Sequence, residues 1–302
     1  MKHKKGLDVN GWLIVDKPTG IGSTTIVNQT RHLFDAKKNG HTGTLDPFAS
    51  GVLPIAFGEA TKLVPYVTDG RKEYEFTLQF GTATDTADLT GQVIQESEKR
   101  PTKDEILEIL PCFLGEITQV PPAYSAVKIN GERAYDLARR GIDVQIPERQ
   151  VTIYWLELLE MVDDSSARFR VECSKGTYVR TLGVDLAEKL GCCGHLTALR
   201  RTKCGHFSLK DTILLENLKK IEYVNERQKF LLPLLTCLCD ITVIAVREED
   251  AAKLRQGQSI SPKNYEVEHL IGKETAAVAD DKPVAMVRIE KTKILPIRVF
   301  NL

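Results

Sequence analysis

One carboxylate, Asp46, lies in a loop of residues 40–54 that is rich in glycine, threonine and proline. Pro47 disfavours the helical backbone region for Asp46, and Gly43 and Gly51 allow another segment of backbone to approach closely. A carboxylate held in such a loop can act as a nucleophile or a base, or it can bond to nearby amides in an Asx-type turn. An isolated Asp-Pro pair favours the turn, so a catalytic role for Asp46 needs support from residues elsewhere in the chain.

An arginine far from the loop is a candidate partner for this carboxylate. Residues 151–159 and 168–173 are strand-like, and Thr177 is expected to cap a helix that ends at Gly191. Arg180 therefore falls in the first turn of a helix that follows a strand, where a lone cation gains nothing from the helix dipole. An arginine placed there is expected to reach a carboxylate.

The segments around the loop are predicted to be short strands and helices. Residues 12–15 form an apolar run typical of a buried strand, and Ser23 is expected to cap the following helix. Residues 72–80 alternate between apolar and polar side chains, which predicts a strand with Tyr74 at the head of its apolar face. Residues 101–110 open with the Pro-Thr-x-x-Glu pattern of a capped amphipathic helix.

The charges balance overall but are unevenly distributed. The 302 residues carry 41 Lys and Arg against 41 Asp and Glu, which argues against a protein that coats nucleic acid indiscriminately. Residues 1–40 have seven basic against three acidic side chains, residues 168–210 have nine against three, and residues 41–117 have six against thirteen. This distribution fits one basic face on a neutral body, and it also fits random clustering of solvated charges.

Several classes of protein are not expected. Seven cysteines, an odd number, do not indicate a disulfide framework. The cluster of cysteines and histidines within residues 192–206 lacks paired zinc-ligand spacing, so we expect reduced, partly buried thiols and no metal site. No apolar run has the length of a membrane span, and the basic start lacks the apolar segment of a signal peptide. A cytoplasmic protein without membrane contact is therefore expected.

Two regions differ from the rest of the chain. Residues 120–150 have proline and glycine at both ends and basic and tyrosine side chains between them, which is typical of a protruding insertion. A helical hairpin with a solvated basic side is the alternative. Residues 241–302 contain short strand patterns, so we expect one domain over residues 1–240, including this insertion, and a small β-rich domain over residues 241–302.

The loop around Asp46 closely resembles the TruB family of tRNA pseudouridine synthases, whose catalytic aspartate lies in a His-Thr-Gly-x-Leu-Asp-Pro-x-Ala-x-Gly-x-Leu-Pro segment. Residues 16–20 share the family's Asp-Lys-Pro-x-Gly turn. Residues 81–88 share its Gly-x-x-Thr-Asp-Thr-x-Asp pattern, although their composition alone predicts only a structured loop. Cys204 and His206 depart from the family, which affects local packing rather than mechanism.

The resemblance implies an α+β fold with a mixed, largely antiparallel sheet flanked by helices, followed by a PUA-like RNA-binding domain that this chain matches less well. It implies isomerisation of uridine 55 in the T-arm of tRNA to pseudouridine, by base flipping, glycosidic cleavage and reattachment at C5. Asp46 is then the catalytic carboxylate, Arg180 its partner, and Tyr74 the ring that stacks on the base. The reaction needs no cofactor and no metal.

The resemblance also implies residues that bind RNA. Leu199 lies against the base in the family, and the insertion folds over the tRNA arm. His41 either fills the space of the flipped base or stabilises its turn, and Lys62 holds a phosphate, pairs with a carboxylate or is solvated. The expected substrate- and RNA-binding residues are His41, Thr42, Gly43, Lys62, Tyr124, Lys128, Arg139, Arg140, Tyr178, Leu199, Arg200 and Arg201. The expected partner is tRNA, bound by a monomer without a protein partner.

Other interpretations stay open. A glycosidase would use Asp46 with a second carboxylate such as Glu59 and would release free base or sugar. A non-catalytic RNA-binding or folding module would keep every function after Asp46→Asn. A pseudouridine synthase for ribosomal or messenger RNA would share the chemistry, although the insertion and the PUA-like tail favour tRNA. Asp46 can attack C1′ as a nucleophile or take a proton from C2′, and Tyr74 or a water can remove the proton from C5.

Overall fold

The structure is a computed structural model that describes residues 6–125, 127–129, 131–142 and 145–302. The basic start of the chain, residues 1–5, and four positions of the expected insertion lie outside the described residues. Among the residues that are described, no helix is long and apolar enough to cross a membrane.

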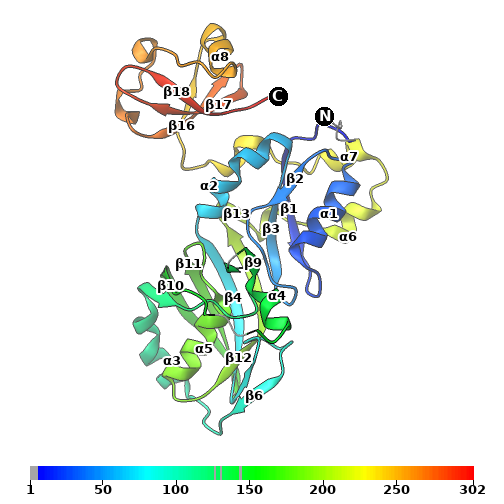
Figure 1. Cartoon of the computed structure of the whole chain (residues 1–302), viewed down its shortest axis with the longest axis vertical. Helices are drawn as coiled ribbons and strands as arrows, with labels where there is room; N and C mark the ends of the chain where they lie inside the picture. The colour runs from blue at the N-terminus through cyan, green and yellow to red at the C-terminus, as the bar shows by residue number, and fades with distance from the viewer. Residues whose placement is uncertain (1–5, 126, 130, 143–144) are drawn as a thin grey trace.

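A ten-stranded sheet forms the larger part of the molecule (Figure 1). Its strands follow the order β14-β1-β3-β12-β4-β11-β10-β7, with β2 paired to β3 and β13 paired to β12. The pairs β1–β14 and β3–β12 are parallel and the others antiparallel, so the prediction of a mixed, largely antiparallel sheet is confirmed. The strands are β1 (Gly11–Lys17), β2 (Asn39–His41), β3 (Ser50–Phe57), β4 (Lys72–Phe80), β7 (Gly115–Gln119), β10 (Arg149–Asp163), β11 (Ser166–Cys173), β12 (Gly194–Cys204), β13 (Phe207–Ser208) and β14 (Ile213–Leu214).

Helices pack on this sheet and on the C-terminal sheet described below, which places the fold in the α+β class. The α-helices are α1 (Ser23–Leu33), α2 (Val64–Asp69), α3 (Lys103–Ile109), α4 (Ala134–Arg139), α5 (Val179–Lys189), α6 (Leu215–Lys220), α7 (Val224–Gln228) and α8 (Glu248–Arg255). Short 3₁₀ helices are η1 (Gly58–Leu63), η2 (Leu110–Phe113), η3 (Leu209–Asp211), η4 (Leu234–Cys237), η5 (Pro262–Asn264) and η6 (Glu268–Leu270). The predicted capping box at the start of α3 is confirmed.

The centre of the sheet has the predicted alternation. β4 coincides with the expected strand, and its Phe76, Leu78 and Phe80 are fully buried in the main apolar core. Tyr74 packs against the same core from a partly buried position. This arrangement places Tyr74 near the start of a central strand of the sheet.

Two predicted helix caps are wrong. α1 has Gly22 as its N-cap, and the hydroxyl of Ser23 bonds to the backbone of Leu45 instead. The hydroxyl of Thr177 does not cap α5 and donates to the carbonyl of Ser174 at 3.0 Å. In both cases the hydroxyl forms a hydrogen bond to a backbone group outside the first turn of the helix.

The expected insertion is a small hairpin followed by one helix. β8 (Lys128–Ile129) pairs with β9 (Glu132–Arg133), and α4 follows directly. Its described part therefore differs from a helical hairpin. A second hairpin, β5 (Thr82–Thr84) with β6 (Val93–Glu96), contains the threonine-rich loop.

A separate four-stranded sheet follows at the C-terminus, as the β-rich pattern predicts (Figure 1). Its order is β15-β16-β17-β18, and α8 packs on it. The strands are β15 (Val243–Ala245), β16 (Glu274–Ala279), β17 (Lys282–Ile289) and β18 (Ile294–Val299).

Candidate functional site

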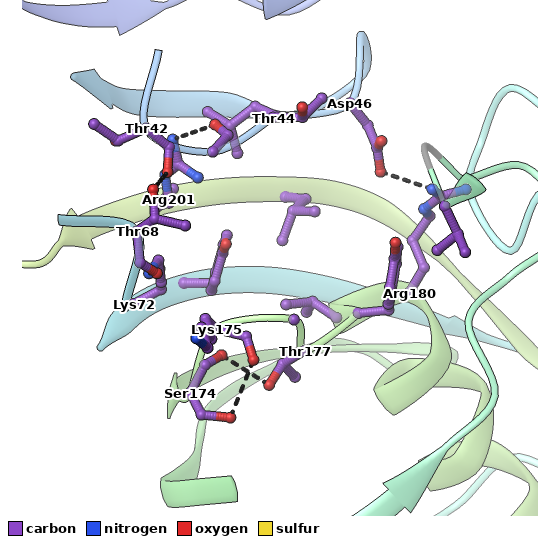
Figure 2. Close-up of a pocket in the computed structure, with 18 of the residues that line it drawn as sticks. Thr42, Thr44, Asp46, Thr68, Lys72, Ser174, Lys175, Thr177, Arg180 and Arg201 are labelled. Carbon is purple, nitrogen blue, oxygen red and sulfur yellow. Dashed lines mark hydrogen bonds and ion pairs between the residues drawn. The ribbon is translucent and has the colours of Figure 1, made fainter. Parts of the chain in front are cut away.

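A cavity of about 470 Å³ opens between the Asp46 loop, the centre of the main sheet, the start of α5 and the insertion (Figure 2). The loop supplies one wall, and β4 and β12 supply the floor. Its lining residues are Thr42, Gly43, Thr44, Leu45, Asp46, Thr68, Lys72, Tyr74, Val127, Lys128, Arg149, Ser174, Lys175, Gly176, Thr177, Tyr178, Val179, Arg180, Leu199 and Arg201. The structure thus brings Asp46, Tyr74 and Arg180 to one cavity from three separate parts of the chain.

Buried polar side chains hold the Asp46 loop in shape. Ser23 Oγ accepts a hydrogen bond from the Leu45 amide at 2.8 Å and donates to the Leu45 carbonyl at 2.9 Å. The buried Lys17 donates to the carbonyls of Pro18 and Ile21 at 2.9 and 2.7 Å, and to that of Pro47 at 3.4 Å. These bonds satisfy backbone groups of an irregular segment, which would otherwise be costly to bury.

Arg201 holds the same loop from the sheet side. Its side chain is buried and donates to the carbonyls of Val52 at 2.7 Å and Gly43 at 3.3 Å. Gly51 has a φ of +104°, and a Cβ there would lie 2.2 Å from the Arg201 carbonyl oxygen, so the position requires glycine. The guanidinium of Arg201 is therefore engaged inside the protein rather than presented on a basic face.

Arg180 joins the Asp46 loop to the threonine-rich loop and to the base of the insertion, and Figure 2 shows its ion pair with Asp46. Its guanidinium lies 2.9 Å from Asp46 Oδ2 and 3.5 Å from Asp88 Oδ2. It also donates to the carbonyls of Thr86 at 2.9 Å and Tyr124 at 2.8 Å. With its side chain only 4% exposed, Arg180 is a buried cation shared between two carboxylates. Such charge-assisted bonds fix the direction of the Asp46 carboxylate.

Asp88 is a site residue that the sequence analysis missed. Its side chain is 6% exposed, and its Oδ1 accepts bonds from Thr86 Oγ1 at 2.8 Å, Thr90 Oγ1 at 2.6 Å and the Thr90 amide at 2.9 Å. Its other oxygen faces Arg180. The sequence places a threonine two residues before Asp88 and another two residues after it, a pattern compatible with a buried carboxylate. This pattern does not identify Arg180 as the cation beside it.

The environment raises the pKa of the Asp46 carboxyl above its ordinary value. Burial is the main cause, because it disfavours the charged form. The Arg180 guanidinium acts in the opposite direction, whereas the negative charge of Asp88 adds to the rise. Asp46 is thus a carboxylate whose ionisation depends on Arg180.

Tyr74 lies directly opposite Arg201 in the β4–β12 register. Burial raises the pKa of the Tyr74 phenol to about 12. At pH 7 a phenol with this pKa is ionised in only about one molecule in 10⁵. Tyr74 therefore presents a neutral ring to the cavity, with Leu199 as a further apolar part of the lining. This arrangement suits stacking better than proton removal by a tyrosinate.

The pKa of Tyr74 leads to a prediction that separates its ring from its hydroxyl. Tyr74→Phe keeps the ring and should retain activity within about tenfold, whereas Tyr74→Leu should lower it by about 10² or more, because base–aromatic stacking contributes roughly 1–3 kcal/mol. Single-turnover rates on a tRNA transcript measure both. Equal losses in the two variants would assign the chemical role to the hydroxyl.

Half of the expected RNA-binding residues line the cavity, and the others lie outside it. Those in the lining are Thr42, Gly43, Lys128, Tyr178, Leu199 and Arg201. Those outside are His41, Lys62, Tyr124, Arg139, Arg140 and Arg200. Their assignment to RNA binding stays a prediction.

The outlying residues have partners of their own. His41 Nδ1 accepts from the Gly43 amide at 3.2 Å, which is the turn-stabilising contact considered above. Arg200 pairs with Asp16 at 2.7 Å. On the insertion, Arg140 pairs with Glu132, and the guanidinium carbon of Arg139 lies 5.5 Å from the Tyr135 ring centroid. Tyr124 lies at the base of the insertion, where its carbonyl accepts from Arg180.

Lys62 and Glu59 pair with each other at 2.5 Å and do not line the cavity. Lys62 therefore has the carboxylate partner that was one of its alternatives. Glu59 also accepts from the Asn301 amide at 2.8 Å, so it is not the second carboxylate that a glycosidase would need beside Asp46.

Comparisons with known proteins agree on one family. The N-terminal domain of TruB family pseudouridylate synthases matches residues 31–179, and the tRNA pseudouridylate synthase B C-terminal domain matches residues 180–238. The chain is 44% identical to tRNA pseudouridine synthase B of Caulobacter vibrioides, covering 100% of this chain and 99% of that protein. It is 47% identical to tRNA pseudouridine synthase B of Rhodopseudomonas palustris, covering 98% and 82%. A chain in the crystal structure of a Cbf5-Nop10-Gar1 complex superposes with a TM-score of 0.72 at 25% identity, covering 96% and 84%.

Proposed function

Because this chain belongs to the TruB family of pseudouridylate synthases, we propose that it converts uridine 55 in the T-arm of tRNA to pseudouridine. The observation that carries this proposal is the contact of Asp46 with Arg180 at 2.9 Å beside Tyr74, in a cavity of about 470 Å³. Relatives that are bacterial tRNA enzymes support a cytoplasmic location.

The proposed reaction begins when the uridine leaves its stack and enters the cavity. The ring of Tyr74 stacks on the base, and Leu199 forms an apolar part of the wall. Ionised Asp46, oriented by Arg180, then acts on the ribose, as a nucleophile at C1′ or as a base at C2′. The glycosidic bond between C1′ and N1 breaks, the base turns, and C1′ forms its new bond to C5, which releases Asp46 if that carboxylate had bonded to C1′. The C5 proton then leaves to a base or water and N1 takes up a proton, so the product is an isomer of uridine.

The proposed RNA contacts surround the cavity. Lys128 and Lys175 are exposed and line it, and Arg139 and Arg140 are exposed on the insertion. Such cations would bind phosphates and position the arm without reading its sequence. We assign residues 1–240 to the catalytic domain and residues 241–302, with their separate sheet, to a PUA-like RNA-binding domain.

The test treats an unmodified tRNA transcript with the protein and maps pseudouridine chemically at single-nucleotide resolution. One modification at position 55 is expected, and a transcript with cytidine at that position should stay unmodified. Free uracil in the supernatant would identify a glycosidase instead. Modification of ribosomal or messenger RNA, but not of tRNA, would contradict the assigned substrate.

A further inference from the structure

The segment that joins β3 to β4 lies between the C-terminal sheet and the cavity. This segment consists of η1 and α2, and Figure 1 shows α2 on the side of the main sheet that faces the C-terminal sheet. Its buried apolar residues belong to one cluster with residues of the C-terminal sheet and the segment after it: Ala60, Leu63 and Val67 with Ala276, Met286 and Phe300. The two parts of the molecule therefore share a core at this point.

Polar contacts fix the same segment to the C-terminal sheet. Tyr66 Oη donates to Glu274 Oε2 at 2.6 Å, and Glu274 Oε1 accepts from Arg288 at 3.1 Å. Burial and the Glu274 carboxylate raise the pKa of Tyr66 well above its ordinary value, so its phenol remains a donor. Lys62 adds a bond to the carbonyl of Val299 at 2.7 Å.

The opposite side of α2 holds the cavity wall. Thr68 Oγ1 donates to the carbonyl of Thr42, in the Asp46 loop, at 2.8 Å. Lys72, which is 6% exposed, donates to three carbonyls at the C-terminal end of α2. Thr42, Thr68 and Lys72 all line the cavity, and Lys72 precedes Tyr74 by two residues on β4. The position of α2 is thus linked to both the Asp46 loop and the strand that carries Tyr74.

We propose that Tyr66 is a positioning residue for the reaction: bonded to Glu274, it lets the C-terminal sheet hold α2 where Thr68 and Lys72 fix the cavity wall. This inference rests on the proposed function. A C-terminal sheet that only bound RNA would need no such chain of partly buried contacts to the cavity. A misplacement of about 1 Å, caused by a change far from the reacting atoms, can lower the rate of a preorganised site by about 10²-fold.

The test compares Tyr66→Phe, Glu274→Leu, which leaves no oxygen to accept the bond, and the double variant with the wild type. Each loses the same bond, so the single-turnover rate at saturating enzyme should fall about three- to tenfold while the dissociation constant for tRNA stays the same. The double variant should be no slower than the slower single variant, because both changes remove one interaction. Tyr223→Phe, at a tyrosine that is 64% exposed, is the matched control and should keep the wild-type rate.

The outcomes distinguish this inference from the proposed function. A wild type that forms no pseudouridine overturns the proposed function. With an active wild type, unchanged rates in both single variants overturn the inference, and so does weaker tRNA binding at an unchanged rate. Additive losses in the double variant also overturn it, because they would show that Tyr66 and Glu274 affect the rate through separate interactions. If Tyr66→Phe unfolds at the assay temperature, Glu274→Leu tests the same bond from its acceptor side.

Discussion

Asp46→Asn should abolish pseudouridine formation, with a fall in the single-turnover rate of about 10⁴-fold or more, while the affinity for tRNA stays unchanged. Asparagine keeps the size of the side chain, and its amide oxygen can still accept a bond from Arg180, so the loop anchored by Ser23 and Lys17 should keep its shape. The amide has neither the charge nor the nucleophilic and basic oxygen that both proposed mechanisms need. Rates on a tRNA transcript and binding of the same transcript measure the two effects separately.

A second aspartate of the chain provides the control for this substitution. Asp185 on α5 is also partly buried, and burial raises its pKa to about 6, but it does not line the cavity. Asp185→Asn should therefore keep the rate of the wild type. If the Asp46→Asn protein still forms pseudouridine, Asp46 is not the catalytic residue.

Local patterns predicted the elements that carry the site. β4 was predicted from the alternation of its side chains, because a strand with one buried face has a strict period of two. The pairing of Arg180 with Asp46 was predicted from the unusual place of an arginine in the first turn of a helix, and the resemblance supplied the partner. The prediction of β4 needed only the local pattern. The prediction for Arg180 also needed the resemblance, which supplied its distant partner.

Other features depend on contacts that no local pattern contains. A serine or threonine before a helix can cap it or bond elsewhere. The positions of distant segments determine which of these bonds forms. Ser23 bonds to Leu45, and Lys17 bonds to carbonyls that include that of Pro47 in the loop. Asp88 likewise became part of the site only because the start of α5 places Arg180 against the threonine-rich loop.

Arg200 and Arg201 are neighbours in the sequence but have different surroundings in the fold. Both were assigned to RNA binding as basic residues, yet they are adjacent on the strand β12 and must face opposite sides of the sheet. Arg200 reaches Asp16, whereas Arg201 is buried against the Asp46 loop. The alternation of a strand thus predicts that the two side chains lie on opposite faces of the sheet, and only Arg201 lines the cavity.

Arg180→Gln should lower the single-turnover rate by about 10²–10³-fold at neutral pH and shift the acidic limb of the pH profile to higher pH. The reaction needs ionised Asp46, whose pKa burial raises and Arg180 opposes. Removing the guanidinium therefore raises this pKa further, so the ionised fraction falls at any pH on the limb and recovers as the pH increases. Single-turnover rates from about pH 5 to about pH 9 measure the shift.

Two further arginine variants separate charge from geometry. Arg180→Lys keeps a cation beside Asp46, but one ammonium group cannot bond to Asp46, Asp88 and the carbonyls of Thr86 and Tyr124 together. Its rate should fall while its acidic limb shifts less than that of Arg180→Gln. Arg168→Gln removes an arginine that is 46% exposed and lies outside the cavity, so it should leave the profile unchanged. A wild-type profile in Arg180→Gln would show that Arg180 does not control the ionisation of Asp46, and its contribution would then be geometric alone.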